Sequence, residues 1–393
     1  MRAIQIALIV CLCFGLSSCT QVRAVWYFFP DIKDYKKFPV VEIKPSQRPF
    51  DFKRNLEGAN QLKHFFDQPP YSLKKVLKKT KTNAFLVYHR DTLIYEYYRK
   101  GFKPHEVRTV FSISKSMVAM LYLDAIHRGK LESFDIPVSK FIPWLQDPAF
   151  EKITLAHLLN MQSGLSIKSK KMADIKEGPA NFYYSPEIRK AMNRLMIVKH
   201  SPGMKFSYED INVQLLMFAI ENIMQKPFLE IFQERLWQPA GTKYPAFWIT
   251  DRSKEQIPYA YSGLTCTAED LAKVGMVLLN KGYACDSLFC SRFYLDELFK
   301  PGVNDPQLNQ KWLWWHNVEM TADSNQEKGQ ERIEDIYADG FRGQFIYIYP
   351  EKDLMIIRTG KKYEYERILF HNPSKRKFKW QTYFLNAARQ FNP

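Results

Sequence analysis

Residues 110–116 read Val-Phe-Ser-Ile-Ser-Lys-Ser, and this stretch decides how the rest of the chain is interpreted. It runs directly into an unbroken apolar row over residues 117–123, and Gly129 follows in a position typical of a helix C-cap. The pattern predicts a helix from Ile113 to about Arg128. Because a helix that is apolar on all sides is buried in the centre of a protein, we expect this helix to form the middle of the core.

The start of this helix carries a candidate nucleophile, Ser112, with Lys115 three residues later. Residues i and i+3 share one face of a helix, so the lysine amine is expected beside the serine hydroxyl. Burial disfavours the ammonium form and lowers a lysine pKa, which predicts a neutral amine that takes the hydroxyl proton. The same Ser-x-x-Lys spacing begins at Ser72 and Ser374, but both lie in basic stretches expected to be exposed. The alternative is a helix-start serine with a lysine that extends to solvent.

Strand patterns lie on both sides of this helix along the chain. Residues 84–89 and 92–98 predict one hairpin, and residues 344–349 and 354–358 predict a second. Residues 130–260 are mostly helical in pattern, a further helix begins after Thr267, and apolar positions from Trp380 to Phe391 recur at helical spacing. We therefore predict an α+β fold, with an antiparallel sheet flanked by helices. Its α/β part comprises residues 60–110 and 262–393, and the inserted helical region comprises residues 111–261.

Composition excludes several classes of protein. The 393 residues are 46% hydrophobic, which is too apolar for a disordered chain, and six Cys are too few for a disulfide scaffold. His and Cys do not cluster, so no metal site is predicted. The formal charge of +16 is scattered apart from a basic run at 375–379. This favours a solubilising surface or attraction to anionic lipid over nucleic-acid binding.

Cys285 and Cys290 are close enough in sequence to pair in an oxidising compartment.

The N-terminus has the pattern of a targeting segment. An apolar run over residues 4–16 is shorter than the roughly 20 residues that span a bilayer, and it fits a signal peptide at 1–18. Leu16-Ser17-Ser18-Cys19 is similar to a bacterial lipobox, which predicts cleavage before Cys19 and lipidation of that residue. The alternative is an ordinary secretory signal with an incidental cysteine. Lipidation predicts a membrane-anchored protein of the bacterial cell envelope that faces the periplasm or the exterior.

Residues 19–59 are expected to form a lipid-anchored tether. Four prolines, at positions 30, 39, 45 and 49, disfavour long helices and central strands in this segment. The aromatic residues 26–29 suit the membrane interface, and packing back onto the body is an equal alternative.

The segment 110–116 resembles the active-site helix start of the serine β-lactamase and penicillin-binding superfamily, in its class C branch. Further segments are similar to this superfamily in the same order. They are Ile153–Leu159 with Gln162–Leu165, Pro202-Gly203 with Phe206–Tyr208, Leu264–Gly275, and Ala338–Gln344 followed by Pro350. The last two resemble the branch of 6-aminohexanoate-dimer hydrolases and related esterases. The resemblance implies a hydrolase domain over residues 60–393 and an acyl-Ser112 intermediate formed without metal or organic cofactor.

The resemblance also implies a role for Tyr208, in the position of the family's Tyr-x-Asn motif. A phenol beside a lysine can be partly ionised and can carry a proton between Ser112 and a leaving group. The third motif position is Asp210 rather than Asn, and a carboxylate cannot donate a hydrogen bond to a substrate carbonyl. Asn212 is the expected substitute, and both residues are predicted to contact the substrate.

The family's Lys-Thr-Gly motif has a weaker counterpart. Arg358-Thr359-Gly360 looks similar, but the positional match is Ala338-Asp339-Gly340, which has neither the cation nor the hydroxyl that binds a β-lactam carboxylate. Gly340 permits close backbone approach, so the N–H groups of Phe341 and Ser112 are expected to form an oxyanion hole. Asp339, Gly340 and Gln344 are predicted to line the substrate site. Arg358 is the residue that could replace the missing cation from the neighbouring strand.

Three functions follow from these motifs. The favoured one is hydrolysis of a small-molecule amide or ester, similar to 6-aminohexanoate-dimer hydrolases and esterases. The second is a penicillin-binding D-Ala-D-Ala carboxypeptidase or β-lactamase, which the absent Lys-Thr-Gly disfavours. The third is a non-catalytic surface lipoprotein that binds a ligand, which the intact Ser112, Lys115 and Tyr208 disfavour.

Overall fold

The computed structural model describes residues 20–27, 29–69, 71–171, 174, 176–300, 310–321, 330–362 and 378–392. The predicted signal peptide, Cys19 and Ser374 lie outside these ranges. Among the described residues, no helix is both long and apolar enough to cross a membrane.

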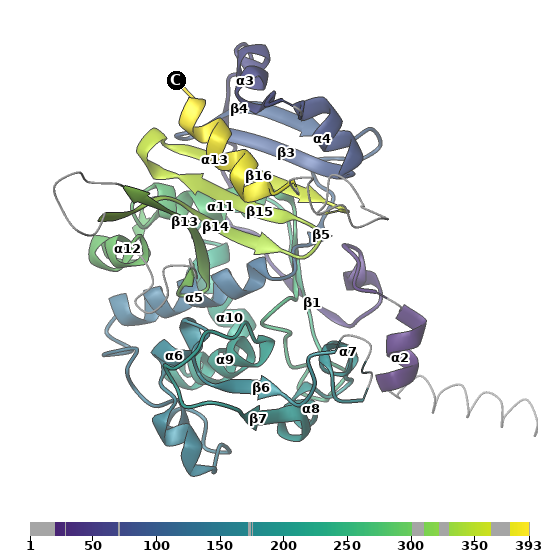
Figure 1. The fold of residues 1–393 in the computed structure, drawn as a ribbon, viewed down its shortest axis with the longest axis vertical. Coiled ribbons are helices and arrows are strands. Elements are labelled where there is room, and N and C mark those ends of the chain that lie inside the picture. The colour runs from purple at the N-terminus through teal and green to yellow at the C-terminus, as the bar shows by residue number, and fades with distance from the viewer. Residues whose placement is uncertain are drawn as a thin grey trace, which may run out of the picture.

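An eight-stranded sheet forms one half of the molecule, in the order β12-β13-β14-β15-β16-β3-β4-β2 (Figure 1). Its strands are β12 Gln310–Lys311, β13 Trp314–Thr321, β14 Gln330–Gly340, β15 Gln344–Tyr349, β16 Leu354–Gly360, β3 Thr82–His89, β4 Thr92–Tyr98 and β2 Lys53–Arg54. Both predicted hairpins are present, β3–β4 and β15–β16. The antiparallel pairing of β16 with β3 joins the two ends of the chain, which confirms the predicted α+β fold.

Helices cover both faces of this sheet because its side chains alternate between two cores. Along β15, Phe345 and Tyr347 join one cluster, whereas Ile346 and Ile348 join the other. The first cluster is closed by α3 Ala59–Phe66, α4 Leu73–Lys79 and α13 Trp380–Gln390. The second contains α5 Ile113–His127 and α11 Ala268–Leu279. As predicted, Thr267 caps α11, since its side chain accepts the Asp270 N–H at 3.1 Å.

The helical region packs on the other side of α5, which therefore lies in the centre of the molecule (Figure 1). It contains α6 Leu155–Leu159, α7 Pro179–Tyr184, α8 Ile188–Leu195, α9 Asp210–Met224 and α10 Phe228–Phe232, with a π-helical turn at Gln233–Trp237. A small hairpin of β6 Leu165–Ile167 and β7 Met196–Val198 lies beside them. The predicted central helix is confirmed, because α5 is buried from Ile113 to Ala125.

A second sheet anchors the N-terminal segment, in the order β1-β8-β9-β5. Its strands are β1 Val40–Ile43, β8 Ala246–Ile249, β9 Leu264–Cys266 and β5 Arg108–Thr109. The remaining short elements include β10 Tyr283–Ala284, β11 Ser287–Leu288, α12 Arg292–Leu298 and 3-10 turns at Asp34–Lys36, Val138–Lys140, Pro148–Lys152 and Pro350–Lys352.

Much of the segment expected as a tether is packed onto the body. β1 pairs with β8, and Phe38, Ile43 and Phe52 are buried. The prolines are compatible with this because β1 is an edge strand and none lies inside it. Before it, α2 Thr20–Tyr27 contacts α7, and the Tyr27 ring lies 5.6 Å from that of Phe38. A free tether is therefore wrong for residues 31–54.

Candidate active site

Ser112 is held at a junction between strand and helix. Val110 donates its N–H to the carbonyl of Leu264 at 2.9 Å, which fixes the chain to β9. Phe111 then adopts a left-handed φ of 51°, an unusual conformation for a bulky residue, and α5 begins directly after Ser112. This sharp turn leaves Ser112 partly exposed between buried neighbours. By contrast, Ser72 precedes the short α4, whose Lys75 is exposed.

Lys115 lies beside Ser112 as the helix spacing predicts. Its buried Nζ donates to Ser112 Oγ at 3.0 Å and to the carbonyl oxygen of Tyr261 at 2.8 Å. The third contact is an ion pair with Asp210 Oδ1 at 2.8 Å. These three acceptors match the three donors of an ammonium group.

The protonation state of Lys115 differs from the prediction. Burial does act to lower its pKa, but the charge and hydrogen bond of Asp210, together with Tyr208, outweigh burial and raise the pKa above its ordinary value. The neutral amine predicted for the free enzyme is therefore wrong. The sequence reasoning counted burial without the carboxylate that α9 brings to Lys115.

Tyr208 joins the same group, at the start of α9. Lys115 Nζ lies 4.9 Å from the centroid of the Tyr208 ring, which packs 5.7 Å from that of Trp315, and the Tyr208 hydroxyl interacts with the side chains of Ser112 and Lys115. Burial of the hydroxyl and the charge of Asp210 raise its pKa, and they outweigh the opposing effects of Lys115 and Ser112. The residue as a whole is nevertheless 39% exposed. The partly ionised phenol predicted for Tyr208 is wrong in the free protein.

The end of β14 lies against the nucleophile turn. A Cβ added to Gly340 would lie 2.1 Å from the carbonyl oxygen of Val110, so only glycine permits this approach. The close approach is to the chain itself rather than to a ligand. The Phe341 ring then meets Phe111 edge-on at 5.5 Å. Among the described residues, neither the Phe341 nor the Ser112 N–H donates a backbone hydrogen bond. Their predicted role as oxyanion donors is compatible with this placement.

Two residues predicted to bind substrate lie elsewhere. Asp339 accepts a hydrogen bond from Gln381 of α13 at 3.0 Å, so it lies on the far face of the sheet from α5. Gln344 is fully buried and joins β15 to β16, donating to the Gly360 carbonyl at 2.7 Å and accepting the Gly360 N–H at 3.0 Å. It also donates to the Phe341 carbonyl at 3.1 Å, so it positions the Phe341 turn instead of contacting substrate.

Asn212 is also a structural residue. It is fully buried, its Oδ1 accepts from Ser163 Oγ at 2.6 Å, and its Nδ2 lies 3.3 Å from Met161 Sδ. The prediction that it replaces the family's substrate-binding Asn is therefore wrong. Asp210 does lie at the site, but its described contact is with Lys115.

Arg358 cannot supply the missing cation. Its guanidinium is fully buried, lies 4.3 Å from the Trp380 ring centroid, and donates to Thr82 Oγ1 and the carbonyl of Thr80. Trp380 belongs to the core on the α13 side of the sheet. Arg358 is therefore directed away from Ser112.

Sequence reasoning missed two residues of the site. Trp315 of β13 covers Tyr208, and Tyr261 supplies a carbonyl acceptor and a ring centroid 5.6 Å from Lys115 Nζ. Neither stands in a recognisable spacing with Ser112. Tyr261 acts through its backbone, for which the sequence carries no residue-specific signal.

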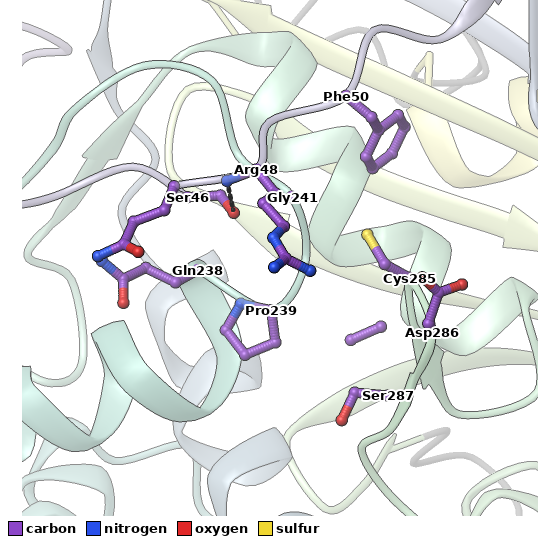
Figure 2. A pocket seen from close by; sticks show the side chains of 11 residues that line it. Ser46, Arg48, Phe50, Gln238, Pro239, Gly241, Cys285, Asp286 and Ser287 are labelled. Atoms are coloured by element: carbon purple, nitrogen blue, oxygen red, sulfur yellow. Dashed lines mark hydrogen bonds between the residues drawn. The ribbon is translucent and has the colours of Figure 1, made fainter.

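A hollow of about 970 Å³ lies on other segments of the surface (Figure 2). It is lined by residues 46–48, Phe50, Gln238, Pro239, Gly241 and the β10–β11 hairpin. None of the predicted site residues lines it. Cys285, on its wall, and the buried Cys290 are both free thiols.

Residues 77–359 match the family model described as Beta-lactamase, which is more than half of the chain. The chain belongs to the beta-lactamase family. A curated relative is the 6-aminohexanoate-dimer hydrolase of Paenarthrobacter ureafaciens, 22% identical over 316 residues, which are 73% of this chain and 74% of that protein. Family membership and this relative support serine hydrolase activity, so the chain is a serine hydrolase.

Solved structures of this family share the fold. A Bacillus anthracis structure that carries the 6-aminohexanoate-dimer hydrolase designation superposes with a TM-score of 0.70 at 20% identity, over 90% of each chain. A class C beta-lactamase in complex with cefoxitin gives a TM-score of 0.55 at 18% identity, over 77% of this chain and 95% of that one. Within the residues that the structure describes, no group of His, Cys, Asp or Glu is arranged to hold a metal.

Proposed function

We propose that this beta-lactamase-family hydrolase cleaves an amide or ester bond of a small molecule through an acyl-Ser112 intermediate. The observation that carries the proposal is the convergence of Ser112, Lys115 and Tyr208 at the buried start of α5. The relative that hydrolyses a 6-aminohexanoate dimer supports a linear amide as the substrate class.

The protonation states define the proposed mechanism. The Lys115 ammonium donates to Ser112 Oγ and stabilises the alkoxide that develops as this oxygen attacks the acyl carbon. The Tyr208 hydroxyl accepts the Ser112 proton and passes its own proton to the leaving nitrogen or oxygen, so the phenol is neutral before and after. The N–H groups of Ser112 and Phe341 hold the tetrahedral oxygen. Water then cleaves the acyl-Ser112 ester by the reverse route.

The charges around the site disfavour substrates with a fixed carboxylate. Ala338 replaces the family's cation, Arg358 is turned to the other side of the sheet, and Lys115 is already paired with Asp210. The Asp210 side chain is 40% exposed and adds a negative charge next to the nucleophile. Losing a charge-assisted hydrogen bond costs about 1.5–3 kcal/mol, or roughly 10–100-fold in affinity.

The test compares kcat/KM for a short p-nitrophenyl ester, a linear amide and nitrocefin. We expect the ester value to exceed the nitrocefin value by roughly 10–100-fold, with Ser112→Ala inactive on all three. A fluorophosphonate probe should label Ser112 and neither Ser72 nor Ser374. Efficient nitrocefin hydrolysis by the wild type would instead favour the β-lactamase or carboxypeptidase alternative.

We also propose that the protein is a lipoprotein of the cell envelope, anchored through Cys19. The lipobox-like Leu16–Cys19 and the apolar run before it support this proposal. It predicts that the native protein partitions with membranes.

A further inference from the structure

Six lysines without an ion pair in the described part of the chain lie along one side of the molecule. They extend from α4 across the end of β16 to the N-terminal segment, and we call them the basic face: Lys33, Lys74, Lys78, Lys81, Lys361 and Lys362. All are exposed except Lys361, which is half-buried. Among the described residues, none of the six forms an ion pair. Some lysines on other surfaces do so, as Lys190 does with Glu187 and Lys243 with Asp51, so what sets these six apart is their continuity along one side of the fold.

The fold makes this face continuous. Lys74 and Lys78 are one turn apart on α4, whose apolar residues Leu73, Val76 and Leu77 point into the core. Beyond the helix, the Lys361 N–H donates to the Lys81 carbonyl at 3.2 Å.

The face continues from Lys361 towards the N-terminal segment. Burial lowers the pKa of Lys361, and the nearby charges of Arg99 and Lys33 act in the same direction, whereas Asp31 opposes them. Arg342 connects these parts, since it donates to the carbonyls of Pro30 and Lys361 at 3.0 and 3.3 Å. In Figure 1, α4 and α2 lie on the same side of the molecule.

We infer that the basic face binds the surface of an anionic phospholipid bilayer and orients the hydrolase on it. Exposed lysines on flexible stems suit diffuse attraction to many headgroups, because an ammonium is a compact, strongly hydrated charge. The described part of the chain begins at Thr20 in α2, on this side of the molecule (Figure 1), one residue after the proposed lipid anchor. A nucleic acid would satisfy the same charges, but it would not account for this position. The inference shares the envelope location with the proposed function and is independent of the hydrolytic chemistry.

The test uses the full-length Cys19→Ser chain, so that binding does not depend on the acyl anchor. Its partitioning is measured by sedimentation with vesicles of phosphatidylcholine alone and with about one-third phosphatidylglycerol. We expect stronger binding to the anionic vesicles that is largely lost at 0.5 M salt, where the Debye length is only a few ångströms. Each lysine near a charged bilayer contributes a factor of about five, so changing Lys74, Lys78, Lys81 and Lys362 to Gln should reduce the partition coefficient by roughly 600-fold.

The matched control changes four exposed lysines on other surfaces to Gln and carries the same net charge: Lys140, Lys152, Lys254 and Lys281. This control should bind anionic vesicles within a few-fold of the parent. Equal losses in the two quadruple variants, or equal binding to neutral and anionic vesicles, would overturn the inference. Loss of single-stranded DNA binding with vesicle binding unchanged would assign the face to nucleic acid instead. Ester hydrolysis by the face variant should be unchanged in solution, which separates this result from a failure of the proposed function.

Discussion

Replacing Asp210 by Asn removes the charge that keeps Lys115 protonated. The carboxylate lies 2.8 Å from Lys115 Nζ and is 40% exposed, so an effective dielectric of roughly 40–80 is appropriate. Coulomb's law then gives about 1.5–3 kcal/mol for this ion pair, so its loss should lower the pKa of Lys115. Burial, which the carboxylate now outweighs, would act in the same direction in the variant.

The sign of the pH dependence follows from the proposed mechanism. The active form holds Lys115 as ammonium and Tyr208 as phenol, so activity is present below their raised pKa values and is lost as pH rises through them. In Asp210→Asn the fall of kcat/KM at alkaline pH should therefore begin at a lower pH than in the wild type. Asp210→Glu keeps the negative charge, so its kcat/KM should fall at the same alkaline pH as that of the wild type.

The assay is the pH profile of kcat/KM on an amide substrate, because esters hydrolyse spontaneously in alkali. If neutral Lys115 were the base, Asp210→Asn would move the acidic limb down instead and raise activity at neutral pH. That outcome would refute the proposed role of the ammonium.

Three further changes test individual features. Gly340→Ala should lower the free energy of unfolding by about 1–3 kcal/mol or more, because its Cβ would lie 2.1 Å from the Val110 carbonyl oxygen. The control is Gly58→Ala, whose Cβ would have no atom within 4 Å, and it should leave the free energy of unfolding nearly unchanged in the same denaturation experiment. Asn212→Ala should cost about 1–3 kcal/mol in stability by leaving the Ser163 hydroxyl proton without its acceptor, with KM unchanged, and a selective rise in KM would restore Asn212 to the substrate site. Cys19→Ser should abolish metabolic labelling by a fatty acid, and persistent labelling would contradict the proposed anchor.

The central elements of the fold could be predicted from local patterns. The apolar row after Ser112 predicts α5, and the 84–98 and 344–358 runs predict the hairpins, because each pattern depends on neighbours in sequence. Helix spacing likewise places Lys115 beside Ser112. The packed N-terminal segment could not be predicted in this way, since β1 is stabilised by β8, about 200 residues away.

The errors at the site have two physical causes. The raised Lys115 pKa depends on Asp210, which lies far along the chain and is brought near by the packing of α9 on α5. The misplacement of Asp339 could have been avoided from the sequence, because side chains alternate between the two faces of a strand. Ala338 and Gly340 share one face of β14, so Asp339 must point to the other. Applied to β14, the same rule would have removed Asp339 from the predicted substrate site.

The order of strands in the eight-stranded sheet has a consequence for synthesis. The β3–β4 hairpin emerges from the ribosome early, but β16, which flanks β3, follows roughly 250 residues later. At about 5–20 residues per second, β3 lacks this partner for roughly 10–50 s. Phe341, which completes the proposed oxyanion hole, also emerges in this late part. The nascent chain should therefore be without hydrolytic activity until translation is nearly finished, and it exposes an unpaired strand edge to chaperones throughout that interval.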